Sequence, residues 1–191
     1  MKKIFLIVYL IPITINQLVF CQQANDNNEE AFLKQIESSG LSVAKSNDLS
    51  LSNNVQIQQI GDYNNASVNQ TLIGTNIRGN IAELIQNGDI NTVVLTQTGS
   101  GNNHYIYQNG NSNMFEGSVT GNNNSSLIDQ IGSDNLVRQE LSGNNMAYII
   151  SQIGNKNEIM QVENDPQSRQ YQVLQNGNDM KLIIINGTGL P

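Results

Sequence analysis

The chain has 191 residues and a formal net charge of −7, and only 13% of its residues are charged. Lys and Arg together number 9 and form no basic run beyond the N-terminus, which disfavours nucleic acid as a partner. Asn and Gln are abundant, with 31 and 19 residues, whereas Trp is absent. Low charge with many side-chain amides and few prolines favours stacked β-structure over a solvated coil.

Residues 1–21 have the pattern of a secretory signal peptide. A basic start with Lys2 and Lys3 precedes an apolar run over 4–15 and a cleavage signal that ends at Cys21. Cys21 is the only cysteine, so no disulfide is expected. Bulky Phe20 before it disfavours the alternative in which Cys21 carries a lipid. We therefore predict a secreted chain.

Residues 22–52 differ in composition from the rest of the chain. The segment begins polar and acidic, has helix-like apolar spacing over 29–38, and then becomes rich in Ser. It is predicted to be a short leader or docking segment in front of the main domain, which spans 53–191.

In the main domain a six-residue phrase, Gln-x-Gly-x-x-Asn, returns at a fixed period. Four copies start 22 residues apart, at Gln86, Gln108, Gln130 and Gln152. Phrases that start halfway between them, at Gln97, Val119 and Leu141, reduce the period to 11. A fixed period of this length indicates a repeat architecture.

Each repeat reads as a strand followed by a tight turn. Apolar residues stand two and four positions before each anchor, as Val93 and Leu95 do before Gln97, and this alternation is typical of a strand with one face turned inward. Turns are predicted around Gly61, Gly88, Gly99, Gly110, Gly121, Gly132, Gly143, Gly154 and Gly177. The predicted fold is all-β, a β-solenoid of about six rungs. Extra residues are expected at 74–79 and near Asp165.

The recurring Gln and Asn have a physical role in such a stack. An inward side-chain amide is unfavourable unless its donors and acceptor are paired. In identical rungs each amide meets another above and below, so a column of amides satisfies itself. We therefore expect ladders of Gln inside the solenoid and of Asn at the turns.

The first repeat, with Gln59, Gly61, Asn64, Ala66 and Gln70, resembles the curlin repeat, and the resemblance extends over about 53–186. By this resemblance the ladder glutamines are Gln59, Gln70, Gln86, Gln97, Gln108, Gln130, Gln152 and Gln175. The matching turn asparagines are Asn64, Asn91, Asn102, Asn113, Asn124, Asn135 and Asn157.

Curlins are the subunits of curli, the extracellular functional amyloid fibres of Gram-negative bacteria. The resemblance implies a secreted subunit at the cell surface that supports adhesion and biofilm matrix. Its implied partners are other curlin subunits, which add end to end, and an outer-membrane secretion apparatus. Irregular repeats behind a leader are more similar to the minor, nucleating subunit. Against this, the last repeat is not basic, since Lys181 is its only basic residue, whereas the minor subunit is associated with a basic last repeat; both assignments stay open.

Three anchor positions depart from the repeat, because Val119, Leu141 and Glu163 stand where Gln is expected. Gln139 and Gln161 lie two residues before the last two of these, so the amide column is expected to step sideways there. A charged side chain at an inward position makes the strand register around Glu163 suspect.

No catalytic, cofactor-binding or metal-binding residue is predicted. His104 is the only histidine, which rules out a His-based metal cluster, and it is interpreted as an inward filler rather than a pH-sensitive rung. No carboxylate cluster repeats on one face, which disfavours an enzyme of the β-helix type. Thr96 and Thr98 flank Gln97 but are not expected to be repeated down the stack, which disfavours a threonine array of the ice-binding kind.

The alternative function is a soluble secreted β-solenoid adhesin that presents a flat outer face to carbohydrate. Few aromatic side chains are expected to point outward, namely Tyr63, Tyr105 and Tyr107, and this weakens the alternative.

Overall fold

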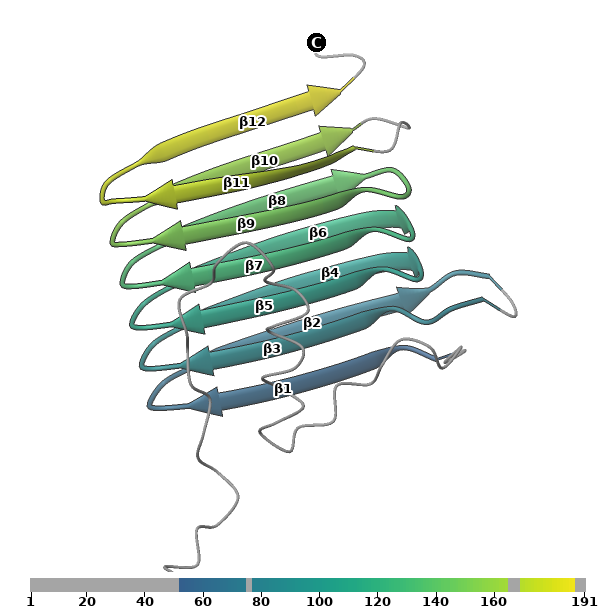
Figure 1. Ribbon diagram of the computed structural model, residues 1–191. Helices are drawn as coiled ribbons and strands as arrows, with labels where there is room; N and C mark the ends of the chain where they lie inside the picture. The colour runs from purple at the N-terminus through teal and green to yellow at the C-terminus, as the bar shows by residue number, and fades with distance from the viewer. Residues whose placement is uncertain (1–51, 75–76, 165–168, 188–191) are drawn as a thin grey trace, which may run out of the picture. The chain divides into compact units, whose positions relative to one another are not determined.

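The computed structural model describes residues 52–74, 77–164 and 169–187, and the predicted signal peptide and nearly all of the leader lie outside these ranges. The described residues form a β-solenoid of stacked strands (Figure 1). The strands are β1 (Asn54–Ile60), β2 (Asn65–Leu72), β3 (Ile81–Asn87), β4 (Thr92–Ser100), β5 (Asn103–Asn109), β6 (Met114–Asn122), β7 (Ser125–Ile131), β8 (Leu136–Ser142), β9 (Ala147–Ile153), β10 (Glu158–Asn164), β11 (Gln170–Asn176) and β12 (Lys181–Gly187).

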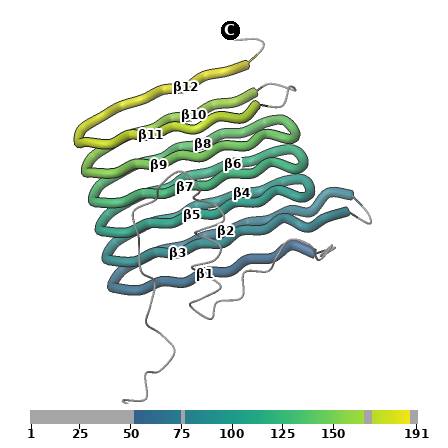
Figure 2. Tube along the Cα trace, in the orientation of Figure 1, coloured from purple at the N-terminus to yellow at the C-terminus, as the bar shows by residue number. Residues whose placement is uncertain are grey.

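The strands form two parallel sheets of six strands each, which confirms the predicted all-β solenoid and its number of rungs. Every strand pairs with the strand two places along the chain, so one sheet contains the odd-numbered strands and the other the even-numbered strands. One rung is therefore one odd and one even strand joined by a turn, and the chain winds upward as a coil (Figure 2). None of the described residues belongs to a helix, so none forms a helix able to cross a membrane.

The strand register absorbs the two irregularities of the repeat. Gln59 pairs with Gln86, 27 residues on, and the predicted extra residues lie in the connection between β2 and β3. Gln152 pairs with Gln175, 23 residues on, which places the other extra residue between β10 and β11. Residues 165–168, where it was predicted, lie outside the described part of the chain.

The core is a narrow apolar strip between the two sheets. Inward side chains of the odd strands stack rung on rung and are fully buried, as Leu84, Ile128 and Ile150 show. Phe115 from β6 fills the space beside them and explains a glycine at an inward position, because a Cβ on Gly117 would lie 2.6 Å from the Phe115 ring. The bulky ring thus takes the volume that two side chains fill in other rungs.

The turns stack as closely as the strands do. A Cβ on Gly110 would lie 2.0 Å from the carbonyl oxygen of Gly132 in the next rung, and Gly110 has φ of 125°. Close approach and left-handed backbone together require glycine there. Two residues further on, each turn places a second residue at positive φ, and in one turn that residue is the β-branched Ile90, with φ of 61°.

Replacing Ile90 by Asn is expected to stabilise the solenoid by about 1 kcal/mol, because Asn tolerates left-handed backbone that a β-branched side chain resists. The Ile90 side chain is 56% exposed, so little apolar contact is lost. Denaturant unfolding measures the change. The reciprocal variant Asn123→Ile, at φ of 57° in another turn, is the matched control and should destabilise by a similar amount. A loss of stability in both variants would contradict the assignment of strain to Ile90.

Candidate functional site

A continuous column of side-chain amides runs through the sheet of odd-numbered strands. Each Gln Nε2 donates to Oε1 of the Gln one rung further along the chain, at 2.7 to 3.0 Å. The four inner members are fully buried. The column comprises Gln59, Gln86, Gln108, Gln130, Gln152 and Gln175, all of them glutamines that the sequence singled out.

The same amides also hold the two sheets together. The second proton of Gln108 Nε2 goes to the carbonyl oxygen of Thr92 on β4, in the facing sheet, at 3.1 Å. Gln130 makes the equivalent bond to Met114 on β6, and Gln86, Gln152 and Gln175 repeat it. Gln86, Gln108, Gln130 and Gln152 therefore use both amide protons, one along the stack and one across it. Gln175, in the last rung, makes only the bond across the stack.

Two further columns, made of Asn, line the turns at both edges of the solenoid. Each Asn Oδ1 accepts the backbone N–H of the equivalent residue in the next rung. Each Nδ2 except that of Asn53 donates to a glycine carbonyl there, as Asn91 does to Gly110 at 2.8 Å, and Asn53 donates to the carbonyl of Gln70. The columns end where Met180 and Met146 replace Asn. One column contains Asn64, Asn91, Asn113, Asn135 and Asn157, and the other contains Asn53, Asn80, Asn102 and Asn124.

Sequence reasoning missed two members of the second Asn column, Asn53 and Asn80. The extra residues between β2 and β3 obscure their spacing from the preceding anchors. A signal was nevertheless present, since Asn80 lies one period of 22 residues before Asn102, to which it is hydrogen-bonded.

The predicted ladder glutamines do not form one column. Gln70 and Gln97 belong to the even-numbered sheet, where Gln70 donates to Gln97 at 2.6 Å and the pair ends. Gln97 then donates to Nδ1 of His104, which is fully buried in the facing sheet, at 2.8 Å. His104 is thus inward, as predicted, and it closes a short amide column by accepting its last proton.

Beyond His104 the interior of this side becomes apolar. Val119 and Leu141, which occupy the next two anchor positions, are buried in a cluster with Met146 and Tyr148. The amide contacts move to a neighbouring position, as the sequence predicted, because Gln139 donates to Gln161 at 2.8 Å. Val119 therefore lies beside Leu141 in the next rung, and Gln139 lies beside Gln161.

The expectation of a disturbed register at Glu163 is wrong. Glu163 pairs in register with Leu141 on one side and Asn186 on the other, and its side chain is fully buried. Local polar partners make the inward position possible. The hydroxyl of Tyr171 donates to Glu163 Oε1, Gln161 Nε2 donates to that hydroxyl at 2.8 Å, and Asn186 donates to the same carboxylate oxygen at 2.9 Å.

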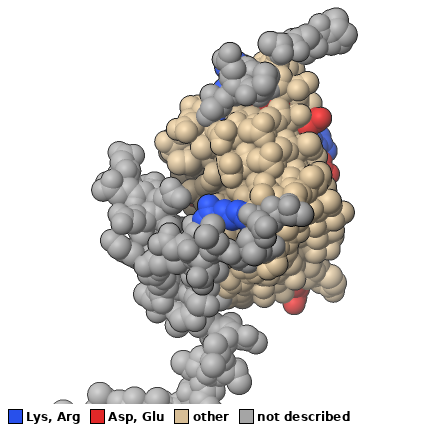
Figure 3. All heavy atoms as spheres, turned by 90° about the vertical axis from the view of Figure 1, so that its right-hand side faces the viewer, with Lys and Arg blue, Asp and Glu red and all other residues tan. Residues whose placement is uncertain are grey.

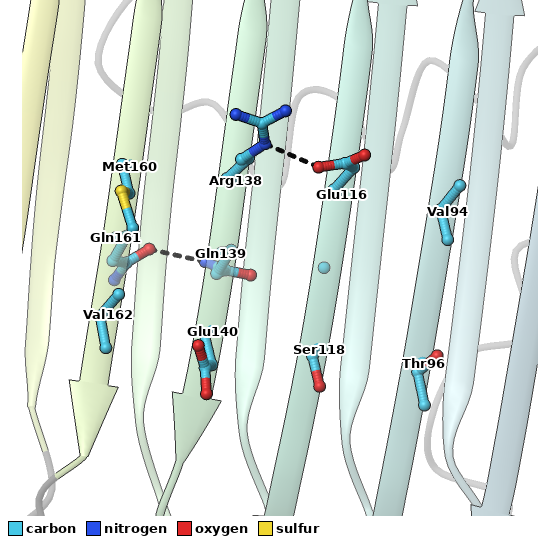
Figure 4. Close-up of a pocket in the computed structure, with 11 residues that line it drawn as sticks. Val94, Thr96, Glu116, Ser118, Arg138, Gln139, Glu140, Met160, Gln161 and Val162 are labelled. Carbon is cyan, nitrogen blue, oxygen red and sulfur yellow. Dashed lines mark hydrogen bonds and ion pairs between the residues drawn. The ribbon is translucent and has the colours of Figure 1, made fainter.

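The outer face of the even-numbered sheet carries a shallow depression of about 390 Å³ over β4, β6, β8 and β10 (Figure 4). Arg138 and Glu116 form an ion pair across it at 2.7 Å, while Val94 and Met160 flank the pair on neighbouring strands. The two charged side chains are 51% and 39% exposed to solvent, so the pair adds little stability. No aromatic side chain lines the depression.

Register also corrects one expectation about Thr98. It pairs with Thr71 and Thr120, and Ser142 continues this outward column of hydroxyls. The neighbouring column, which contains Thr96, changes to Glu140 two rungs later, so paired hydroxyls occur on β4 and β6 alone. Within the described ranges no group of His, Cys, Asp and Glu side chains could hold a metal ion.

No protein-family model, curated protein sequence or solved structure matches this chain. The solenoid and its amide columns therefore provide the basis for inferring its function.

Acid is expected to weaken the solenoid through His104. Burial lowers the pKa of His104 to about 4, with a smaller opposing effect from the Gln139 amide. The unfolded chain takes up a proton near pH 6.5 and the folded chain does not, so stability falls as the pH drops from about 6.5 to 4, by about 3 kcal/mol.

The measurement is the free energy of unfolding against pH for the wild type and for His104→Gln. Other titrating groups are common to both chains, so the difference between the two curves isolates His104. The two curves should diverge below pH 6.5. Parallel curves would show that His104 is not buried as a neutral imidazole.

Proposed function

We propose that the chain is a secreted structural subunit of curli-type functional amyloid fibres that grow by stacking solenoids end to end. The observation that carries this proposal is the state of the first rung. Val55 and Ile57 occupy inward positions on β1 and are 42% exposed, whereas their partners on β3, Ala82 and Leu84, are buried. A further rung stacked against β1 would bury Val55 and Ile57 in the way that Ala82 and Leu84 are buried.

Both ends of the described solenoid support stacking. Strands β1 and β12 each pair with one neighbouring strand within the chain, so each leaves one edge open. An open strand edge is a template for pairing with another strand. Among the described residues, the buried Gln70 Oε1 has no hydrogen-bond partner, and it lies in the rung at which the amide pair begins. An amide donor from a neighbouring subunit would satisfy this acceptor.

Weak charge repulsion also favours association. Most of the described surface seen in Figure 3 is neither acidic nor basic. Two ion pairs on the even-numbered sheet, Glu116 with Arg138 and Glu158 with Lys181, join strands of adjacent rungs rather than repel them. Low net repulsion between stacked rungs is the condition under which cross-β structure persists.

The proposal extends to the minor, nucleating kind of subunit. One amide column is continuous over all six odd-numbered strands, whereas the other stops after Gln97 and is replaced by the Val119 and Leu141 cluster. A chain with one complete column would offer a template to a more regular partner subunit while extending itself poorly. Adding preformed aggregates of this chain should shorten the lag of that partner, and an unchanged lag would argue against nucleation.

Fibre growth is tested most directly at the open end formed by β12. The purified mature chain should form fibres that bind thioflavin, and Ile184→Asp should slow their elongation by about ten-fold or more, because it places an unpaired charge at an inward position that stacking would bury. Ile183→Asp, on the outward side of the same strand, is the matched control and should elongate nearly as the wild type does.

A wild-type chain that remains monomeric and soluble at high concentration would overturn the proposal. The carbohydrate-binding adhesin would then be the better hypothesis, and the depression beside Arg138 and Glu116 would be its first candidate surface. Tyr63, one of the few aromatic residues expected to point outward, lies in a turn and is 88% exposed, and it does not line that depression.

A further inference from the structure

Asn–Gly pairs recur at one place in the solenoid, the end of an odd-numbered strand. Asn87–Gly88, Asn109–Gly110 and Asn176–Gly177 lie in register with one another. A fourth pair, Asn186–Gly187, ends β12. In the remaining rungs the same column position holds Ile60, Ile131 and Ile153.

The Asn–Gly pair has an intrinsic reactivity. The backbone nitrogen of glycine attacks the side-chain carbonyl carbon of the preceding Asn, a C–N bond forms, and ammonia leaves with the side-chain nitrogen. Water then opens the cyclic imide on either side and yields aspartate or isoaspartate. Glycine permits this attack most readily because it has no side chain to obstruct it and its backbone turns freely.

The folded solenoid engages the reacting groups in hydrogen bonds to the neighbouring rung. The nitrogen of Gly110 donates to the carbonyl oxygen of Asn87 at 2.9 Å, and the nitrogen of Gly88 donates to Ile60 at 2.9 Å. Gly177 makes the equivalent bond to Ile153 at 2.9 Å. The Asn87 side chain itself donates to that of Asn109 at 3.3 Å. Attack therefore requires a rung to open.

We propose that the Asn–Gly pairs at residues 87, 109 and 176 are deamidation sites that react in the unfolded chain and that rung stacking silences. They act as a timer, because a chain that stays unfolded for too long loses its ability to fold. This inference concerns the folding of one solenoid and holds whether or not the chain forms fibres.

The chemical products explain why the loss would be lasting. Aspartate at both Asn87 and Asn109 would place like charges on neighbouring strands, where directly opposed charges destabilise a sheet. Isoaspartate adds one backbone atom at the end of the strand, directly before the tight turn. Gly88 and Gly110 in these turns have positive φ and stack closely on the next rung, so a lengthened backbone there disturbs the stacking of the turns.

Deamidation is measured at each site by peptide mass spectrometry after the full chain has aged in denaturant or in its folded form. We expect the three sites to react at least about ten-fold more slowly in the folded chain, since the reaction then depends on local opening. Asn87 and Asn109, which lie between rungs, should be protected more strongly than Asn176 in β11. Equal rates in folded and unfolded chains would overturn the proposal.

A variant with Asn87→Ile, Asn109→Ile and Asn176→Ile tests the consequence for folding. Ile already occupies this column in three rungs, so the fresh variant should refold as well as the fresh wild type. Asn186–Gly187 remains in both chains and records equal ageing.

After equal ageing in denaturant, the wild type should recover less β-structure on dilution, measured by infrared spectroscopy, and the variant should keep most of its yield. If the aged wild type refolds as well as the fresh chain, or if the variant loses as much, the proposed timer is wrong.

Discussion

The structure depends on one constraint, which is that a buried side-chain amide must find partners for two protons and one acceptor. In the interior of this solenoid the requirement is met by repetition. Rungs stack about 4.8 Å apart, a distance at which one amide donates to the next. The second proton goes to a backbone carbonyl oxygen of the facing strand, as in the bond from Gln130 to Met114. The same amide therefore connects rungs and joins sheets. A slip of one residue would leave all of these groups unpaired, and register is therefore strongly specified.

The even-numbered sheet shows how the constraint is met when Gln is absent. The apolar anchors Val119 and Leu141 lie next to one another, and Gln97, which pairs with Val119, donates to His104 and to backbone carbonyl oxygens instead of to another Gln. Where polar groups return, they return as a connected set, with Gln161, Tyr171, Glu163 and Asn186 linked by hydrogen bonds. Buried polar groups are stable in this way only when each finds a partner, which makes the composition of one rung depend on that of its neighbours.

Much of this arrangement could be predicted from the sequence, because period and alternation are local properties. The 22-residue period indicates the rungs, and the residues before Gln97 indicate which side faces inward. The sequence does not show which inward residues meet across the solenoid. The bond from Gln97 to His104 depends on the packing of facing sheets, and the buried Glu163 depends on a tyrosine hydroxyl brought by another strand. Charge at an inward position therefore suggested a broken register where none exists.

The central claim is that equivalent glutamines of one chain stack on each other through their side chains. Solid-state NMR on assembled protein can test it directly, with isotope-labelled chains diluted in an excess of unlabelled chains so that only contacts within one chain are observed. We predict a side-chain contact between Gln108 Nε2 and Gln130 Cδ in the diluted sample, as expected from a bond of 2.8 Å between these amides. A flat amyloid in which each glutamine stacks on the same residue of a neighbouring chain would lack this contact after dilution. That result would contradict the stacking of glutamines within one chain.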